Sequence, residues 1–293
     1  MNRKLIALAK PYVVTDGRKF KISRRPTAVA HRVAHSKKLL KTSRDELCRL
    51  QELLYAQDRW GVLLIFQAMD AAGKDSAIEH VMSGVDPAGC QVFSFKAPSS
   101  EELDHDFLWR TSKSLPERGR IGIFNRSYYE ETLIARVHPE ILSHQKLPSR
   151  LVTKRIWKER FEDIVAFERY FARQGFLILK FFLHVSKKEQ RNRFLARLDQ
   201  PEKNWKFSMG DLKERDKWGT YQKMYEDAIR HTAAKHAPWI VVPADDKRYA
   251  RTVVAAAIVD ALERLKLTFP ALSPEQQSDL RRARRMLGGG RPR

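Results

Sequence analysis

Two spacings of apolar residues alternate along this chain of 293 residues. Short, nearly continuous apolar runs are typical of strands that are buried on both faces, and they predict strands at 62–68, 90–95, 120–124, 176–184 and 238–243. Apolar residues three and four positions apart are typical of helices that cover such a sheet. This spacing predicts helices at 42–57, 75–83, 100–113, 127–137, 149–174, 186–199, 216–235 and 247–266.

The alternation of strands and helices predicts the fold class. Strands separated by helices pair in parallel, and their helices cover both faces of the sheet. We therefore expect an α/β protein built on a mostly parallel five-stranded sheet. Ligands in such sheets bind beyond the carboxyl ends of the strands, so residues that follow the strands are the first candidates for a site.

The most informative stretch is 63–76, LLIFQAMDAAGKDS, in which an apolar run ends in a short turn before a helix. A strand, a tight loop, a lysine and a helix form the layout of a phosphate-binding loop. Backbone amides and the helix N-terminus surround an anion there, and the lysine adds a point charge. The candidate residues are Asp70, Ala71, Ala72, Gly73, Lys74, Asp75 and Ser76.

Two positions depart from the generic pattern of such a loop. Ala68 stands where the first glycine is usual, and Asp75 stands where a Ser or Thr follows the lysine. Mg²⁺ prefers a few carboxylates together with waters and phosphate oxygens, so Asp70 is a candidate Mg²⁺ ligand or proton acceptor. The alternative is an ordinary strand-to-helix turn with an exposed lysine.

A second candidate group, 125–131, follows the strand at 120–124. Arg126 can hold phosphate oxygens with two parallel hydrogen bonds, and Asn125 precedes it. Glu130 could hold metal-bound water or position an acceptor. Alternatively, Ser127 and Glu130 form a capping box, which needs no chemistry.

A third segment, 191–217, combines a helix with an irregular basic stretch at 200–215. A mobile basic segment that closes over transferring phosphates would exclude water and neutralise charge. The alternative is a solvated helix face. Asp211 is either a loop carboxylate for a metal or a helix N-cap. The candidate cations are Arg193, Arg197, Lys203 and Lys206.

The net charge of +21 lies mainly at the two ends of the chain. Residues 1–41 carry twelve Lys or Arg and one Asp, and residues 281–293 carry six Arg and no acid. Basic arms bind polyanions such as DNA, RNA or a phosphate polymer by releasing counterions, although they can equally be solubilising ends. We expect residues 1–41 to wrap or dangle, and the polar tail from about 273 to be disordered.

Hydropathy and cysteine content indicate the compartment in which the protein works. No apolar stretch approaches the roughly 20 residues that span a bilayer, and we expect no membrane partner. Cys48 and Cys90 are the only cysteines, with neither metal nor redox spacing. These features favour the cytoplasm.

The chain resembles the polyphosphate kinase 2 family, and within it class III. The resemblance covers about 40–268 and rests on 63–76, 93–110, 123–131, 179–212 and 237–251. It implies a three-layer α/β/α P-loop-kinase-like domain over 42–268 with a helical lid at about 190–217. It also implies Mg²⁺-dependent phosphoryl transfer, with Mn²⁺ as the alternative ion, between inorganic polyphosphate and AMP, ADP or ATP. The resemblance further favours a homo-oligomer.

Position by position, the resemblance assigns Asp70 and Lys74 to the reaction centre. It matches Asn125 followed by Glu130 to class III, the class that phosphorylates AMP as well as ADP. The four basic residues of 190–217 fall in the lid. The basic N-terminal arm and the tail at 269–293 lie outside the resemblance, and their roles are not implied by it.

Two other functions are compatible with parts of the pattern. An ATP-dependent nucleotide or small-molecule kinase would share the loop and the lid, and its donor would differ. A non-enzymatic nucleic-acid-binding protein would explain the basic arms. The central 239 residues carry only about +4, so we expect no nucleic-acid partner beyond nonspecific binding by the arms.

Overall fold

The computed structural model describes residues 7–29 and 36–288. Its centre is a six-stranded sheet with the strand order β1-β6-β5-β2-β4-β3. Four of the five strand pairings are parallel, and only β1 runs antiparallel to its neighbour β6. The strands are β1 (Val13–Val14), β2 (Gly61–Ala68), β3 (Cys90–Ser94), β4 (Ile121–Asn125), β5 (Phe176–His184) and β6 (Trp239–Pro243).

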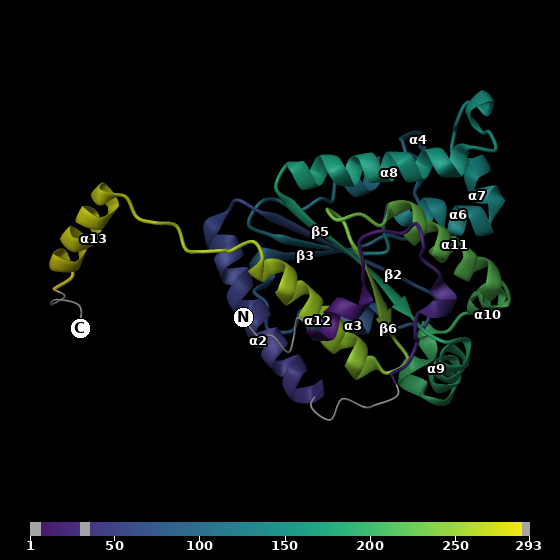
Figure 1. The fold of residues 1–293 in the computed structure, drawn as a ribbon, viewed down its shortest axis with the longest axis horizontal. Coiled ribbons are helices and arrows are strands. Elements are labelled where there is room, and N and C mark those ends of the chain that lie inside the picture. Colours follow the sequence, from purple (N-terminus) through teal and green to yellow (C-terminus); the bar gives the residue numbers. More distant parts are fainter. Residues whose placement is uncertain (1–6, 30–35, 289–293) are drawn as a thin grey trace.

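Helices cover both faces of the sheet, which gives the predicted three layers (Figure 1). On one face lie α2 (Ser36–Gln57), α3 (Lys74–Val81) and α12 (Lys247–Glu263). On the other lie α8 (Ile156–Arg173) and α11 (Trp218–Thr232). The remaining α-helices are α4 (Ser100–Asp104), α5 (Trp109–Ser112), α6 (Ile134–Val137), α7 (Pro139–His144), α9 (Lys187–Asp199), α10 (Met209–Asp216) and α13 (Pro274–Met286).

The core is built from the central parallel strands and the helix α12. All eight residues of β2 are buried, and the rings of Phe66 on β2 and Phe181 on β5 stack with centroids 4.9 Å apart. Continuous burial explains why these strands lack an alternating apolar pattern. The five predicted strands are confirmed, and this packing fixes the carboxyl ends of β2 and β4 side by side.

A buried polar network holds the segment after β4. The Lys180 ammonium on β5 lies 2.6 Å from a Glu168 carboxylate oxygen on α8, and both side chains are almost fully buried. The Tyr128 and Tyr129 hydroxyls donate to the same carboxylate at 3.0 and 2.9 Å. Removing one partner would leave a buried charge unpaired, which costs several kcal/mol, about 3–5. The network therefore anchors the residues next to Glu130.

Three predicted helices are wrong in extent. The segment 127–137 forms a 3-10 helix at Tyr128–Thr132 and then α6, because the tyrosine hydroxyls are drawn to the buried carboxylate of Glu168. The segment 100–113 is divided into α4 and α5. The helix predicted from 149 starts only at Ile156, after a short 3-10 turn.

The basic N-terminal segment packs onto the domain over the described residues 7–29. β1 pairs with β6, the Tyr12 and Tyr249 hydroxyls are 2.8 Å apart, and the Ile22 N–H donates to a Glu226 carboxylate at 2.8 Å. α2 begins at Ser36, inside the expected arm. Residues 1–6 and 30–35 of that arm lie outside the described residues. The sequence pattern missed β1 because two residues give no periodicity.

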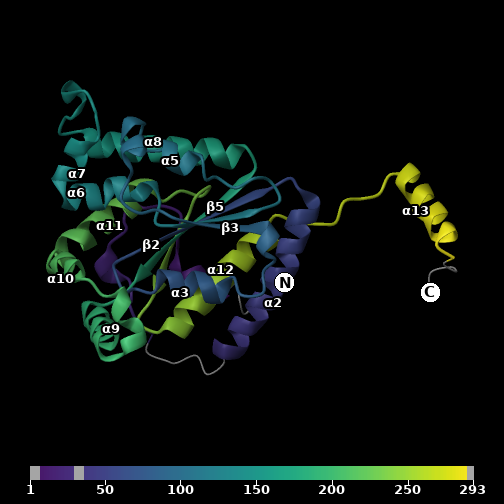
Figure 2. The same cartoon turned by 180° about the vertical axis from the view of Figure 1, so that it is seen from behind.

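The C-terminal segment forms α13, where we expected disorder. Ser273 and Gln276 make a reciprocal capping box, and Pro274 occupies the first helical turn. These local signals explain the helix, which stands apart from the sheet in both views (Figures 1 and 2). No helix in 7–29 and 36–288 is both long enough and apolar enough to cross a membrane.

Candidate active site

The loop between β2 and α3 has the backbone conformation of an anion-binding turn. Ala71 and Gly73 have φ angles of 58° and 98°, in the left-handed region that Gly adopts without strain and Ala does not. Gly73 is the N-cap of α3, so the first-turn N–H groups from Lys74 to Ser76 have no intrahelical partner. Loop and helix together offer backbone donors to an anion.

Lys74 reaches back across this loop. Its ammonium donates to the Ala68 carbonyl at 3.0 Å. Burial lowers the pKa of Lys74, and the nearby Asp70 carboxylate opposes that shift. An anion bound in the loop would favour the charged ammonium in the same way.

Arg126 meets the phosphate loop from the end of β4. Its N–H donates to the Phe66 carbonyl at 3.0 Å, and its φ of 66° places it in the left-handed region, a conformation that concentrates at functional sites. The guanidinium lies 3.5 Å from an Asp70 carboxylate oxygen. Burial opposes its charge, but the carboxylates of Glu130 and Asp70 raise the pKa of Arg126 above its ordinary value.

Asn125 links the two segments directly. Its amide nitrogen donates to Asp75 at 2.5 Å and lies 3.4 Å from the Ser94 hydroxyl at the end of β3. Three parallel strands thus contribute to one cluster at their carboxyl ends, as the topology requires. An aspartate at 125 would set two carboxylates against each other.

Glu130 does not form the capping box. The Ser127 hydroxyl accepts from the Tyr129 N–H at 3.1 Å, and with its amide nitrogen facing Glu130, Gln67 donates to that carboxylate at 2.8 Å. Burial raises the pKa of Glu130, while Arg126 and Lys74 act in the opposite direction. Glu130 is therefore a partly buried carboxylate that lines the same cavity as Asp70 and Arg126.

Arg193 is brought to the loop, but it does not present an open guanidinium. On α9, its five N–H groups face Glu189 and the carbonyls of Ala71, Ala72, Ala244 and Asp245, at 2.6–3.2 Å. The side chain is 7% exposed. Arg193 thus ties the phosphate loop to the end of β6, a role that its spacing with Arg197 did not reveal.

The predicted lid is more regular than expected. Residues 200–215 form a 3-10 helix, Pro201–Lys206, and most of α10. Ser208, not Asp211, is the N-cap of α10. Asp211 pairs with Arg197 at 3.2 Å, and burial together with the Asp70 charge raises the pKa of this carboxyl.

Two cavities meet at Asp70 and Arg126, which line both. The larger, which we call the basic cavity, has a volume of about 660 Å³. The smaller, which we call the aromatic cavity, has a volume of about 280 Å³. The cations of the basic cavity are Lys74, Lys96, Arg126, Arg193, Arg197, Lys203, Lys206 and Lys247. The aromatic cavity is lined by Glu130, Leu133, Ile134, His138, Ile141, Glu214, Tyr221 and Tyr225, among others.

Several residues of the basic cavity were not predicted. Lys96 and Lys247 each follow a strand at the active edge of the sheet, and that position was the signal that could have revealed them. Two residues outside the lining of this cavity also contact the phosphate loop: Arg251 donates to the Ser76 hydroxyl, and Gln190 donates to the Asp70 carbonyl at 2.9 Å. These last two contacts join elements far apart in sequence and leave no local pattern.

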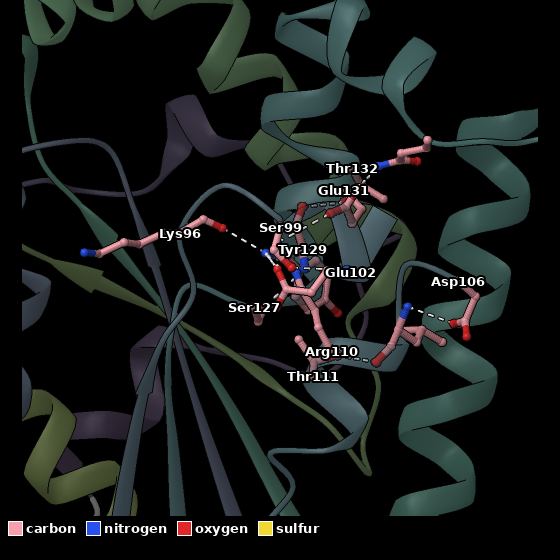
Figure 3. A network of polar contacts seen from close by, with 12 residues as sticks. Lys96, Ser99, Glu102, Asp106, Arg110, Thr111, Ser127, Tyr129, Glu131 and Thr132 are labelled. Atoms are coloured by element: carbon pink, nitrogen blue, oxygen red, sulfur yellow. Dashed lines mark hydrogen bonds and ion pairs between the residues drawn. The ribbon is translucent and has the colours of Figure 1, made fainter. Parts of the chain in front are cut away.

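Lys96 is held by its backbone. The buried Arg110 donates to the Lys96 carbonyl at 2.8 Å and lies 3.6 Å from both the Glu102 and Glu131 carboxylates. Figure 3 shows the Lys96 side chain extending away from this network. Arg110 therefore ties the loop carrying Lys96 to the segment that carries Glu130.

The donor set at the junction fits a magnesium ion held mainly by substrate. Within 7–29 and 36–288 no group of three or more His, Cys, Asp and Glu is arranged to bind a metal. Mg²⁺ is usually bound through one or two carboxylates, with water and phosphate oxygens completing its shell. Asp70 can supply one such carboxylate because it lines both cavities, whereas Asp211 lines neither and pairs with Arg197.

The comparisons with known proteins agree with this geometry. The polyphosphate kinase 2 (PPK2) family matches residues 31–270. The chain belongs to this family. A PPK2 crystal structure from Arthrobacter aurescens TC1 has a TM-score of 0.84 and 38% identity, and the match covers 93% of this chain and 95% of that one.

Two curated PPK2 relatives carry different names. The ADP-polyphosphate phosphotransferase of Rhodopseudomonas palustris is 51% identical, over 95% of this chain and 98% of its own. The AMP/ADP-polyphosphate phosphotransferase of Meiothermus ruber is 46% identical, over 79% of this chain and 82% of its own. The chain is thus a polyphosphate kinase of the PPK2 type.

Proposed function

We propose that this chain transfers a terminal phosphoryl group between inorganic polyphosphate and a nucleoside mono- or diphosphate, in either direction. The observation that carries the proposal is that Asp70 and Arg126 lie where a basic and an aromatic cavity meet. A linear polyanion needs cations along a track, whereas a nucleotide offers a base and a sugar. The names of the two relatives match this pair of substrates.

In this proposal the basic cavity holds polyphosphate. The first-turn N–H groups of α3 and the Lys74 ammonium bind its terminal phosphates, and Lys203 and Lys206 follow the polymer outward. Phosphoryl transfer requires mainly alignment and charge stabilisation from the protein. Arg126 stands between the cavities and would stabilise the phosphoryl group in flight.

Asp70 would hold Mg²⁺, with Mn²⁺ as the alternative ion. When bound, the ion would neutralise phosphate charge, and the Asp70 carboxylate would hold the ion at the junction of the cavities. Arg126 lies 3.5 Å from the same carboxylate and would orient it. In this proposal Asp70 therefore binds the metal ion at the junction of the two cavities.

The aromatic cavity would hold the nucleotide, with its phosphates toward Arg126. Glu130 lies at the inner end and would place the acceptor phosphate, while Tyr221 and Tyr225 offer faces to a base. The pattern of Asn125 with Glu130 is that of class III, so we propose that AMP and ADP are both acceptors.

The test is an assay with purified protein, Mg²⁺, long-chain polyphosphate and either AMP or ADP. We expect AMP to yield ADP and then ATP. If only ADP reacts, the family assignment holds and the class assignment fails. If neither reacts while ATP phosphorylates another acceptor, the donor assignment is wrong.

The substitution Asn125→Asp sharpens the class assignment. The new carboxylate would face Asp75 at hydrogen-bond distance, repel it and disturb the acceptor side. We expect the ratio of kcat/KM for AMP to that for ADP to fall about tenfold or more, a change of about 1.4 kcal/mol. Asn192→Asp, at an exposed position of α9 where the amide lies 3.4 Å from a Glu189 carboxylate oxygen, is the control, and it should leave the ratio unchanged.

A further inference from the structure

The C-terminal helix α13 is an exposed, arginine-rich element. Every described residue from 268 to 288 is exposed. Four arginines lie within five positions of the helix, and the chain ends with two more. The family match stops at residue 270, before this helix begins. The core of the enzyme therefore explains neither the helix nor its charge.

The arginines share one side of α13. Residues three and four positions apart are neighbours on a helix, so Arg281 lies beside Arg285, and Arg282 also lies beside Arg285. Glu275 lies in the first turn and Arg285 in the last, an arrangement that complements the helix dipole. The result is a short ladder of positive charge that faces solvent.

We propose that α13 captures long-chain polyphosphate and raises its concentration near the basic cavity. The inference rests on the function proposed above. Charge complementarity carries it, because the substrate is a linear polyanion and the ladder is cationic. The helix also carries an apolar stripe of Leu280, Ala283 and Leu287, with the exposed Met286 near its end. The binding experiment below therefore includes anionic vesicles as a competing partner.

The fold sets how this capture depends on polymer length. α12 begins at Lys247, which lines the basic cavity, and runs 17 residues away from it, about 25 Å. The chain is last buried at Leu267, and the six residues 268–273 extend the reach by at most about 20 Å. A long polymer can contact α13 and the cavity together, whereas a chain of a few phosphates cannot.

The experiment compares two triple variants of the full-length chain. R281Q/R282Q/R285Q removes three charges from α13, and K37Q/K38Q/K41Q removes three exposed charges from the first turns of α2. For long-chain polyphosphate at low salt, we expect the α13 variant to raise KM about threefold to tenfold. Its kcat and its KM for the nucleotide should not change. The α2 variant should stay within about 1.5-fold of the wild type.

Two further conditions make the result specific. With hexaphosphate as the donor, and at about 1 M salt, where screening acts over about 3 Å, the α13 variant should match the wild type. An equal rise in KM with hexaphosphate, or an equal rise in the α2 variant, would overturn capture by α13. So would an unchanged KM for long chains.

A direct binding measurement separates this inference from the proposed function. Fluorescent long-chain polyphosphate is titrated with each protein in the absence of nucleotide. Weaker binding by the α13 variant alone supports capture even if the wild type shows no turnover. Equal binding by all three proteins overturns it. Loss of binding to anionic phospholipid vesicles or RNA, with polyphosphate binding unchanged, would assign α13 to that partner and refute the inference.

Discussion

The two cavities that meet at Asp70 and Arg126 are built in different ways. Lysines reach the basic cavity from α3, from the loop after β3, from the 3-10 helix Pro201–Lys206 and from the start of α12. Tyrosines, apolar residues and carboxylates from the segments around α6, α10 and α11 line the aromatic cavity. The basic cavity is the larger and is lined by eight cations, whereas the aromatic cavity is smaller and is lined mainly by tyrosines, apolar residues and carboxylates.

This difference matches the two kinds of substrate that we propose. A phosphate polymer repeats one charged unit, so binding it requires a track of cations and no reading of shape. A nucleotide carries a base, which needs flat apolar surfaces and a few placed polar groups. Substitutions in each cavity should therefore affect the KM of one substrate only, and substitutions at their junction should affect both.

The largest effect is expected at the shared phosphate loop. Lys74→Ala removes the ammonium beside the transferring group, and we expect kcat to fall about 10³-fold with either acceptor. The thermal unfolding midpoint should not decrease, because burial already disfavours the charged form of Lys74. Lys188→Ala, at an exposed position of α9, is the control. Near-normal turnover by the Lys74 variant would refute its assignment.

The next effect should separate the cavities. K203Q/K206Q removes two cations from the basic cavity, so we expect KM for polyphosphate to rise about tenfold. KM for the nucleotide should not change. The exposed pair K188Q/K223Q serves as the matched control. A parallel rise in both KM values would show that one substrate occupies both cavities.

A substitution in the aromatic cavity should have a smaller effect, and it should change KM for the nucleotide and not KM for polyphosphate. The Tyr221 hydroxyl donates to Glu214 on the lid helix α10. Tyr221→Phe keeps the ring but leaves that carboxylate without this donor, so we expect KM for the nucleotide to rise about threefold. KM for polyphosphate should stay constant. Tyr170→Phe, at an exposed position on α8, should change neither value.

The smallest effect concerns stability and pH. Burial raises the pKa of Glu130 in the folded chain, so the folded state holds a proton more tightly than the unfolded chain does. The contribution of Glu130 to stability is therefore present at low pH and is lost as the pH rises through the folded pKa. We expect Glu130→Gln to raise the unfolding midpoint by about 1–4 °C at pH 8 and to leave it unchanged at pH 4. A lower midpoint at pH 8 would contradict this sign.

The local sequence pattern was sufficient to predict those strands and loops that are formed by one continuous stretch of the chain. Continuous runs of apolar residues predict the buried strands, and the five predicted strands are present. The phosphate loop is a single strand-turn-helix segment, so its position in the chain could be predicted from neighbouring residues, although Gln190 and Arg193 on α9 also hold its carbonyls. Asn125 and Arg126 could be placed beside it because parallel strands bring their carboxyl ends to the same edge.

The local sequence pattern was insufficient to predict features that depend on hydrogen bonds or ion pairs between segments far apart in the chain. The helix predicted over 127–137 was wrong because Glu168, some 40 residues further along, draws two tyrosine hydroxyls away from a helical path. Arg193 was predicted as a phosphate-binding cation of the lid; it lines the basic cavity, and the sequence pattern did not show that the Ala72 and Ala244 carbonyls also accept from its guanidinium. Ser208 capped α10 in place of Asp211, which instead pairs with Arg197.

The sequence by itself determined the order of strands and helices, the phosphate loop and the two basic ends. Each of these depends on residues that are close together in the chain. Only the tertiary structure decided that one edge of the sheet carries two cavities that meet at Asp70 and Arg126. The physical reason is that a cavity is the space left between packed helices, strands and loops. Its lining depends on contacts between distant segments, which the local spacing of apolar residues does not predict.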